Sequence, residues 1–267
     1  MSLAEPTGKH CDMTLGSTAI CRFTVLTVNI HMGFTAFNRR FILPELREAV
    51  RSVSADVVFL QEVHGIHTHH SRRYSNWPTM PQYEFLADSI WPQFAYGRNA
   101  VYPDGDHGNA LLSKFQIIRH DNLDVSIAGS KRENRGLLHC VLRLPGDSRE
   151  VHAICVHLGL FETHRRQQLQ LLAQRLEELP ADTPLIVAGD FNDWRQRADA
   201  LLNPCGLHEV FVEHYGKPAR SFPARLPTLR LDRIYVRNLK AQHPKVLKTR
   251  PWSHLSDHAP LSVEVEL

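Results

Sequence analysis

Apolar side chains recur at strand and helix spacings along most of the chain. Residues 22–29, RFTVLTVN, alternate in polarity and are rich in β-branched side chains, so they predict a strand that ends on Asn29. Residues 39–55 predict a helix with one apolar face. The residues of that face are Leu43, Leu46, Val50 and Val53. The apolar run DVVFLQE then predicts a buried strand that ends on Glu62.

A second unit of helix and strand follows later in the chain. Residues 161–180 repeat the helical spacing of leucines, and residues 183–193, TPLIVAGDFND, predict an apolar strand that runs into acid and amide side chains. Further strands are predicted at residues 94–99, 108–113, 135–144, 150–158, 229–237 and 258–267. Strand-rich halves with interleaved helices predict an α/β fold in which two sheets pack as a sandwich.

The composition is that of a globular protein with one large core. The chain has 267 residues, of which 43% are hydrophobic, and no Pro-, Gly- or Ser-rich linker divides it. We therefore expect a flexible tail at residues 1–19 and a single domain at residues 20–267. The formal net charge of +3 is too small to indicate nucleic-acid binding by itself.

Cysteine usage and the N-terminal sequence favour a reducing compartment. The five cysteines are odd in number, widely spaced and without a C-x-x-C pair, which argues against a disulfide framework or a zinc ribbon. The first residues lack the basic start and apolar run of a signal peptide, and no apolar run is long enough to span a membrane. We expect a cytoplasmic protein without an integral membrane segment or an obligate protein partner.

Polar side chains collect where the predicted strands end. The sequence lacks the motifs typical of nucleotide-binding folds, zinc proteases and serine hydrolases. Because strand ends on one side of a sheet meet at a shared cleft, these polar side chains are candidates for catalysis. They are Asn29, Glu62, His157, Asp190, Asn192, Asp232, Asp257 and His258.

Asp190 and Asn192 form a pair suited to acid and base chemistry. They stand two residues apart, so both side chains point to the same side of an extended backbone. A carboxylate beside an amide can hold and deprotonate a water molecule. A turn capped by the aspartate is the structural alternative.

Asp257 and His258 are adjacent just before the last predicted strand. Aspartate suits a hard cation, and histidine can bind a phosphoryl oxygen or act as an acid or base. An unpaired Asp232 inside its apolar strand would be costly, so we expect Asp232 to orient His258. A surface ion pair of Asp232 with Arg230 or Arg233 explains that segment equally well.

A histidine-rich segment at residues 59–70, FLQEVHGIHTHH, contains the end of the second predicted strand. The pattern His67-x-His69 suits zinc, but the aspartate and last histidine of the zinc-hydrolase motif are missing. The alternative is a solvated loop that binds no metal. We expect residues 64–70 to form a loop at the rim of the cleft, where it could touch substrate.

Seven motifs, in this order, resemble the endonuclease/exonuclease/phosphatase superfamily of metal-dependent phosphoesterases, which includes DNase I. They are TVNI with Asn29, FLQE with Glu62, GNALLS with Asn109, VHL with His157, GDFND with Asp190 and Asn192, LDRIYV with Asp232, and SDHAPL with Asp257 and His258. They span residues 22–265, nearly the whole chain. Longer stretches such as AGDFNDWRQRA look like a small bacterial branch of the superfamily.

The resemblance implies a Mg²⁺- or Mn²⁺-dependent phosphodiesterase or phosphatase. The implied fold is a four-layer α/β sandwich, in which two packed sheets are flanked by helices. By motif, Asn29, Glu62 and Asp257 hold the metal. Their oxygen donors match the ligand preference of Mg²⁺ and Mn²⁺.

The resemblance also assigns catalytic roles. Asp190 orients and deprotonates the attacking water, with help from Asn192. His157 and His258 bind the phosphoryl oxygens, and Asp232 supports His258. These groups supply what in-line attack on a phosphate needs: a positioned water and positive charge at the non-bridging oxygens.

Asn109, Arg135 and Arg165 are expected to contact the substrate phosphate, and Arg98 is a further candidate. Arginine suits this task because it binds phosphate through two parallel hydrogen bonds. For Arg98 and Arg135, a solvated surface position is the alternative.

The substrate class stays open between three hypotheses. DNA, RNA or a nucleotide comes first, since six basic residues and one acid lie between Lys217 and Arg237, although a solvated basic face explains them as well. A phospholipid head group or another small phosphodiester comes second. A non-catalytic phosphate-binding module comes third. All the central ligand types are present in the chain, and this counts against a site that has lost its catalytic activity.

Overall fold

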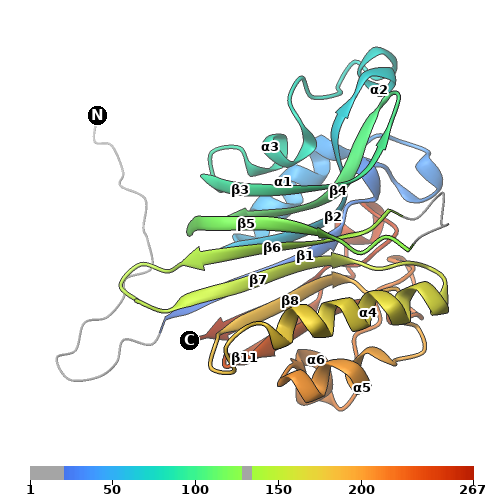
Figure 1. Ribbon diagram of the computed structural model, residues 1–267. Coiled ribbons are helices and arrows are strands. Elements are labelled where there is room, and N and C mark those ends of the chain that lie inside the picture. Colours follow the sequence, from blue (N-terminus) through green and yellow to red (C-terminus); the bar gives the residue numbers. More distant parts are fainter. Residues whose placement is uncertain (1–20, 128–133) are drawn as a thin grey trace.

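The computed structural model describes residues 21–127 and 134–267. In these ranges the chain forms two six-stranded sheets that pack face to face, with helices on both outer faces (Figure 1). This confirms the predicted four-layer α/β sandwich. The predicted tail, residues 1–19, lies outside the described residues, and its separation from a single catalytic domain stays a prediction.

The first sheet has the strand order β11-β12-β1-β2-β4-β3. β1 and β2 are parallel, and the other neighbouring pairs are antiparallel. The strands are β1 (Arg22–Asn29), β2 (Val57–His67), β3 (Gln93–Tyr102), β4 (Gly105–Ser113), β11 (Lys240–Val246) and β12 (Leu261–Glu266).

The second sheet has the strand order β5-β6-β7-β8-β10-β9. Here β7 and β8 form the parallel pair, and the other neighbours are antiparallel. The strands are β5 (Gln116–Asp124), β6 (Gly136–Arg143), β7 (Glu150–His157), β8 (Leu185–Asp190), β9 (His208–Glu209) and β10 (Asp232–Arg237).

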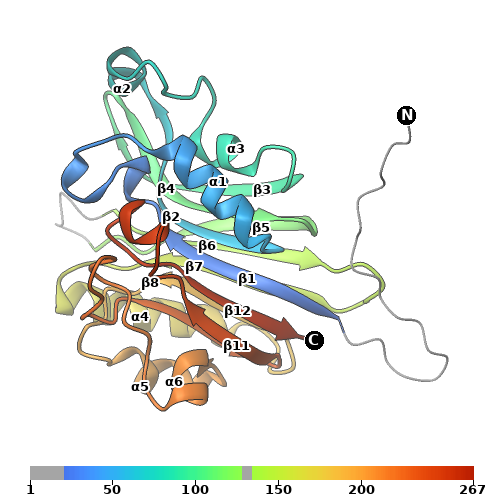
Figure 2. The same cartoon turned by 180° about the vertical axis from the view of Figure 1, so that it is seen from behind.

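Helices cover the outer faces of both sheets (Figures 1 and 2). α1 (Leu43–Val53) and α3 (Gln82–Ala87) pack on the first sheet, and α4 (Glu162–Glu177) and α5 (Ala198–Leu202) pack on the second. The short helices are α2 (Thr68–Arg73), which follows β2, and α6 (Val210–Tyr215), which contacts strands of both sheets. None of the helices in the described ranges has the length and apolar content needed to span a bilayer.

The core between the sheets explains why the apolar strands are buried on both faces. Phe59 of β2 points into this core and belongs to the same buried cluster as Leu111 and Ile186. Its neighbours Val58 and Leu60 point to the opposite face and pack under α1. Side chains alternate along a strand, so an unbroken apolar run fills the inter-sheet core and the sheet–helix core at once.

The structure corrects the prediction that residues 64–70 form a loop. β2 continues through Glu62 to His67, and the next residue begins α2. Glu62 adopts a positive φ of 55°, and the pairing of β2 with β4 shifts in register between Leu60 and Val63. A bulge accommodates one extra residue, and the strand continues beyond it. The pattern of apolar and polar residues does not reveal such a bulge. The polar residue Glu62 therefore marks a distortion within the strand.

Replacing Phe59 by alanine tests the inter-sheet core. Phe59 is fully buried, so Phe59→Ala should lower the free energy of unfolding by about 3 to 5 kcal/mol through lost burial and a residual cavity. Ile66 on the same strand is 63% exposed, so Ile66→Ala should change the free energy of unfolding by about 0.5 kcal/mol or less. Urea unfolding measures both. Equal losses in the two variants would contradict this description of β2.

Candidate active site

Strand ends from both sheets meet at one edge of the sandwich. β7 and β8 are parallel and place His157 beside Asp190, while antiparallel β10 places Asp232 on the other side of Asp190. Asn29, the last residue of β1, donates from Nδ2 to Asp190 Oδ2 at 3.2 Å. The register of the strands therefore brings residues that are far apart in the sequence to a single cluster.

Glu62 reaches this cluster through the bulge in β2. The positive φ of Glu62 turns its side chain out of the regular alternation of the strand. Its carboxylate accepts a hydrogen bond from Asn29 Nδ2 at 3.1 Å and lies 4.0 Å from His157 Nε2. The amide of Asn29 thus links the carboxylates of Glu62 and Asp190.

His31 belongs to the cluster and was missed by the sequence analysis. Its Nδ1 lies 3.3 Å from Asp257 Oδ2 and 3.6 Å from Glu62 Oε2, so the ring stands between two predicted metal ligands. Burial works to lower the pKa of His31, but the hydrogen bond to Glu62 and the charge of Asp257 outweigh it and raise the pKa. The available sequence signal is its place two residues after the strand-ending Asn29.

A turn directly after β8 holds Asp190. The Asn192 backbone N–H donates to Asp190 Oδ1 at 2.9 Å, and Asn192 itself has a positive φ of 51°. The Asn192 side chain instead donates to the carbonyl oxygen of Leu158 at 2.9 Å. The turn capped by Asp190, which was the structural alternative for this segment, is therefore present. It fixes one oxygen of Asp190 while the other faces Asn29, His157 and His258.

The expected pairing of Asp232 with His258 is present. His258 Nδ1 lies 2.8 Å from Asp232 Oδ2, and both side chains are buried. The opposite ring nitrogen, Nε2, lies 3.8 Å from Asp190 Oδ2. Ser256 Oγ donates to the carbonyl of Asn29 at 2.7 Å and so anchors the segment before β12 against the end of β1.

His157 and His258 have opposite electrostatic environments. Burial lowers the pKa of His157 well below its ordinary value and the charge of Arg135 lowers it further, so this ring is neutral at neutral pH. Burial also works against charge on His258, but Asp232 and Asp190 outweigh it and raise its pKa. The ring of His258 is therefore a cation at neutral pH.

Asp190 is buried between these two rings. Burial raises the pKa of Asp190, and the charge of Asp232 adds to the rise, whereas the charge of His258 opposes it. A raised pKa makes the carboxylate a better proton acceptor than an exposed aspartate. The arrangement can therefore take a proton at Asp190 and present positive charge at His258.

Arg135 is a predicted phosphate ligand that lies close to the cluster. Its charge lowers the pKa of both His157 and His107. Its Nε is buried and has no hydrogen-bond partner among the described residues. Arg98 is exposed on β3, in agreement with the alternative of a solvated surface position.

Asn109 does not take the position expected of a phosphate ligand. Its side chain is fully buried, and Nδ2 donates to the carbonyls of Gly136 at 3.0 Å and Cys155 at 3.3 Å. These bonds join β4 of the first sheet to β6 and β7 of the second. Backbone carbonyls take up the donors of the amide, and the phosphate contact of Asn109 stays a prediction.

Arg165 is also held by the fold. Its Nη1 donates to the carbonyls of Gly159 at 3.1 Å and Leu160 at 2.9 Å, and its Nη2 pairs with Glu162. The guanidinium lies over the ring of Trp194, 4.4 Å from the centroid, and the residue is 1% exposed. Its Nη1 is turned toward the backbone that follows β7, which favours a structural role, and the phosphate contact of Arg165 stays a prediction.

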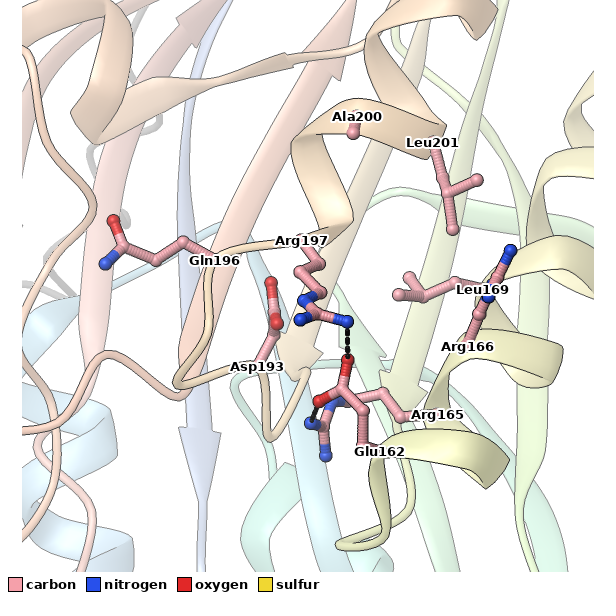
Figure 3. Close-up of a pocket in the computed structure, with 9 residues that line it drawn as sticks. All are labelled: Glu162, Arg165, Arg166, Leu169, Asp193, Gln196, Arg197, Ala200 and Leu201. Atoms are coloured by element: carbon pink, nitrogen blue, oxygen red, sulfur yellow. Dashed lines mark hydrogen bonds and ion pairs between the residues drawn. The ribbon is translucent and has the colours of Figure 1, made fainter.

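A cavity of about 330 Å³ lies between α4 and the segment after β8 (Figure 3). Its lining consists of Glu162, Arg165, Arg166, Leu169, Asp193, Gln196, Arg197, Ala200 and Leu201. Glu162 pairs with both Arg165 and Arg197. The strand-end residues predicted for catalysis are not part of this lining, so the cavity is separate from the cluster.

The oxygen donors at the sheet edge fit a hard divalent cation. The carboxylates of Glu62 and Asp257 flank the ring of His31, whose Nδ1 lies 3.6 Å from Glu62 Oε2 and 3.3 Å from Asp257 Oδ2. Asn29 Oδ1 accepts from the His31 N–H at 3.0 Å and keeps a second lone pair. Carboxylate and amide oxygens are the ligands that Mg²⁺ and Mn²⁺ prefer.

The sandwich fold and the strand-end cluster fit a hydrolase of phosphoester bonds, and a match to a family model supports this class. A family model described as Endonuclease/Exonuclease/phosphatase family matches residues 26–258. The chain belongs to this family.

A relative of high identity and several solved structures of the same fold were found. YbhP of Escherichia coli K12 is 58% identical over 246 residues, which cover 92% of this chain and 96% of YbhP. A family member from Beutenbergia cavernae has a TM-score of 0.72 at 18% identity, covering 92% of this chain and 72% of the other. A mannosyl-6-phosphatase of Bacteroides thetaiotaomicron has a TM-score of 0.68 at 19% identity, covering 91% and 99%.

D. rerio TDP2, in complex with a single-stranded DNA product, has a TM-score of 0.66 at 18% identity, covering 91% of this chain and 98% of TDP2. At these identities the solved structures share the fold. The family assignment rests on the family model and on the relative from E. coli.

Arg165→Ala distinguishes a structural role from phosphate binding. Loss of the buried guanidinium leaves the carbonyls of Gly159 and Leu160 without this donor and Glu162 with Arg197 alone, so the free energy of unfolding should fall by about 2 to 3 kcal/mol. The KM for an aryl phosphodiester should stay unchanged. Arg166→Ala, at an exposed neighbour on α4, should change neither quantity. A severalfold rise in KM without loss of stability would restore the phosphate-binding role.

Proposed function

We propose that this protein is a Mg²⁺- or Mn²⁺-dependent phosphoesterase that cleaves phosphodiester or phosphomonoester bonds by in-line attack of water. One observation carries the proposal: Asp190, which has a raised pKa, lies within 3.8 Å of ring nitrogens of His157 and His258 and is linked by Asn29 to Glu62. A base, two groups for phosphoryl oxygens and the donors for a cation therefore lie in one cluster.

Asn29, Glu62 and Asp257 would hold the cation. Burial works against ionisation of Glu62, but its hydrogen bonds with His31 and Asn29 contribute to holding its pKa well below the ordinary value, so the carboxylate is charged at neutral pH. When bound, the cation supplies Lewis-acid charge at the phosphoryl oxygens. His31 borders the same carboxylates.

Asp190 would take the proton from the attacking water. The Asn192 N–H fixes Oδ1, so Oδ2 is the oxygen that faces the cluster. Asn192 acts here through its backbone, and its side chain holds the turn in place through Leu158. A base fixed in this way loses little orientational freedom when the water binds.

His258 and His157 would bind the phosphoryl oxygens. His258 carries positive charge and is oriented by Asp232 through Nδ1, so Nε2 presents a donor. His157 is neutral and can donate one hydrogen bond without adding charge. Arg135 adds a positive charge close to His157.

We favour DNA, RNA or a nucleotide as the substrate. Two arginines, Arg220 and Arg225, are exposed in the segment before β10. The same segment touches the site, since Ala224 N–H donates to the Asp257 carbonyl at 2.7 Å and the Phe222 ring lies 5.0 Å from that of His258. Exposed positive charge beside the reacting phosphate suits a polyanionic backbone.

A phospholipid head group is the second candidate. Its support is a set of exposed apolar side chains in segments beside the site: Leu160 at 55% and Phe161 at 63% follow His157, and Leu226 at 73% precedes Asp232. Apolar side chains at a cleft mouth can contact lipid or stack on bases. We propose a cytoplasmic location in either case.

Removing the base tests the mechanism. Asp190→Asn keeps the shape of the side chain but cannot accept a proton, so kcat for an aryl phosphodiester should fall by about 10² to 10⁴-fold. Chelation of divalent cations should abolish the wild-type rate, and Mg²⁺ or Mn²⁺ should restore it. Stopped-time assays of nitrophenol release measure both effects.

Asp182→Asn serves as the control for Asp190→Asn, because Asp182 is exposed in the connection before β8. It should keep the wild-type rate. Wild-type activity of Asp190→Asn, or full activity in the presence of chelator, would contradict the proposal.

A substrate panel ranks the candidates. DNA, RNA, nucleotides and lipid head groups are compared at equal concentration, with Asp190→Asn as the blank. Cleavage of lipids without cleavage of nucleic acid would place the phospholipid ahead of DNA, RNA and nucleotides. A wild-type protein inert on all of them, including aryl phosphodiesters, would instead support the non-catalytic phosphate-binding module.

A further inference from the structure

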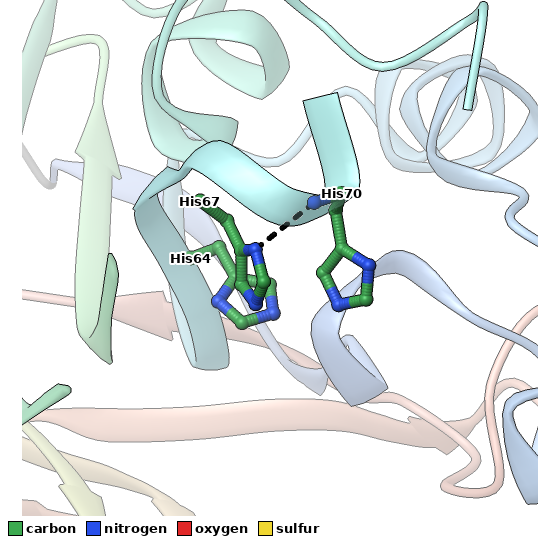
Figure 4. Close-up of side chains that lie close together, drawn as sticks. All are labelled: His64, His67 and His70. Carbon is green, nitrogen blue, oxygen red and sulfur yellow. Dashed lines mark hydrogen bonds between the residues drawn. The ribbon is translucent and has the colours of Figure 1, made fainter. Parts of the chain in front are cut away.

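Three imidazoles that the proposed phosphoesterase site does not use lie together beyond the bulge of β2. Among the described residues, His64, His67 and His70 each offer a ring nitrogen, and these atoms lie within 4.8 Å of one another. His64 belongs to β2, His67 ends that strand and His70 lies in the first turns of α2. Figure 4 shows the three rings side by side beneath α2.

Hydrogen bonding at Nδ1 of His64 leaves its other ring nitrogen, Nε2, available to bind a metal. Its Nδ1 lies 3.3 Å from the carbonyl oxygen of Asp106 and 3.0 Å from the hydroxyl of Tyr102. A carbonyl can only accept, so a hydrogen bond to it places the proton of a neutral His64 on Nδ1 and the lone pair on Nε2. His64 is 2% exposed, and this Nε2 is buried without a hydrogen-bond partner in the described part of the chain.

His67 and His70 complete the group from the start of α2. Their ring centroids are 3.8 Å apart. His67 Nδ1 accepts from the His70 N–H at 3.2 Å and so caps the helix. Coordination through the other nitrogen of His67 requires the proton on Nδ1 and releases this bond. We therefore expect the first turn of α2 to move when a metal binds.

Aromatic side chains surround the three imidazoles. The Trp77 ring centroid lies 5.0 Å from that of His70, 6.0 Å from that of His67 and 5.8 Å from that of His64. Tyr102 lies 5.8 Å from His67. An apolar wall of this kind limits access of water to a metal and strengthens its bonds to nitrogen. A set of three imidazole nitrogens selects Zn²⁺ and related transition ions over Mg²⁺.

We propose that His64, His67 and His70 bind one divalent transition-metal ion, with Zn²⁺ preferred and the fourth position open to water. Zn–N bonds of about 2.0 to 2.1 Å in a tetrahedral site place ligand nitrogens about 3.4 Å apart, so nitrogens that lie within 4.8 Å of one another must close by at most about 1.4 Å. Movement of the first turn of α2 supplies that change. This site is distinct from the cation site of Glu62 and Asp257, and it does not depend on the proposed phosphoesterase activity.

Zinc titration of the full-length protein, without a histidine tag and in excess Mg²⁺, tests the proposal. The wild type should bind one Zn²⁺ per chain, measured by competition with a chromogenic chelator. His67→Ala and His70→Ala should weaken binding by at least about tenfold. His69→Ala is the matched control, because His69 is exposed between them and should leave the affinity unchanged.

Several outcomes would overturn the site. They are absence of Zn²⁺ binding by the wild type, equal affinity in all three variants, or loss of Zn²⁺ binding in Asp257→Asn, which would locate the ion among the carboxylates. X-ray absorption at the zinc edge identifies the ligand atoms around the ion in the wild-type protein. It therefore tests the site even if a variant does not fold. Three imidazole ligands and one oxygen are expected, and a shell dominated by carboxylate oxygen would contradict the proposal.

Discussion

The buried carboxylate of Asp190 is the interaction on which the geometry of the site depends. Its Oδ2 accepts from Asn29 of the first sheet and lies 3.6 Å from His157 and 3.8 Å from His258. A buried carboxylate without partners would be strongly destabilising, so the strand ends that supply these partners must meet in register. The same requirement that stabilises the sandwich edge also brings together the groups to which we assign phosphoester chemistry.

Much of the fold could be predicted because the inter-sheet packing leaves a simple pattern. Strands buried on both faces appear as apolar runs, and β1 matches its prediction at residues 22–29. The strand-end residues could be found because parallel strands expose their last residues at one edge. Asp232 and His258 could be paired because an aspartate in an apolar strand needs a partner.

Other features depend on tertiary geometry that one sequence does not encode locally. The bulge at Glu62 keeps β2 running to His67, so a polar residue did not mark a strand end. Arg165 and Asn109 looked free to bind phosphate, but the backbone carbonyls they contact become neighbours only after folding. His31 entered the cluster through a backbone turn with a positive φ, which no apolar periodicity reports.

The central claim is that this cluster directs water onto phosphorus. Hydrolysis of an aryl phosphodiester in water enriched in heavy oxygen, followed by mass spectrometry of both products, tests it most directly. Attack of water on phosphorus should place one heavy oxygen in the phosphate monoester and none in the phenol, because the bond from phosphorus to the leaving oxygen breaks. Heavy oxygen in the phenol, or no turnover with Mg²⁺ or Mn²⁺ present, would contradict it.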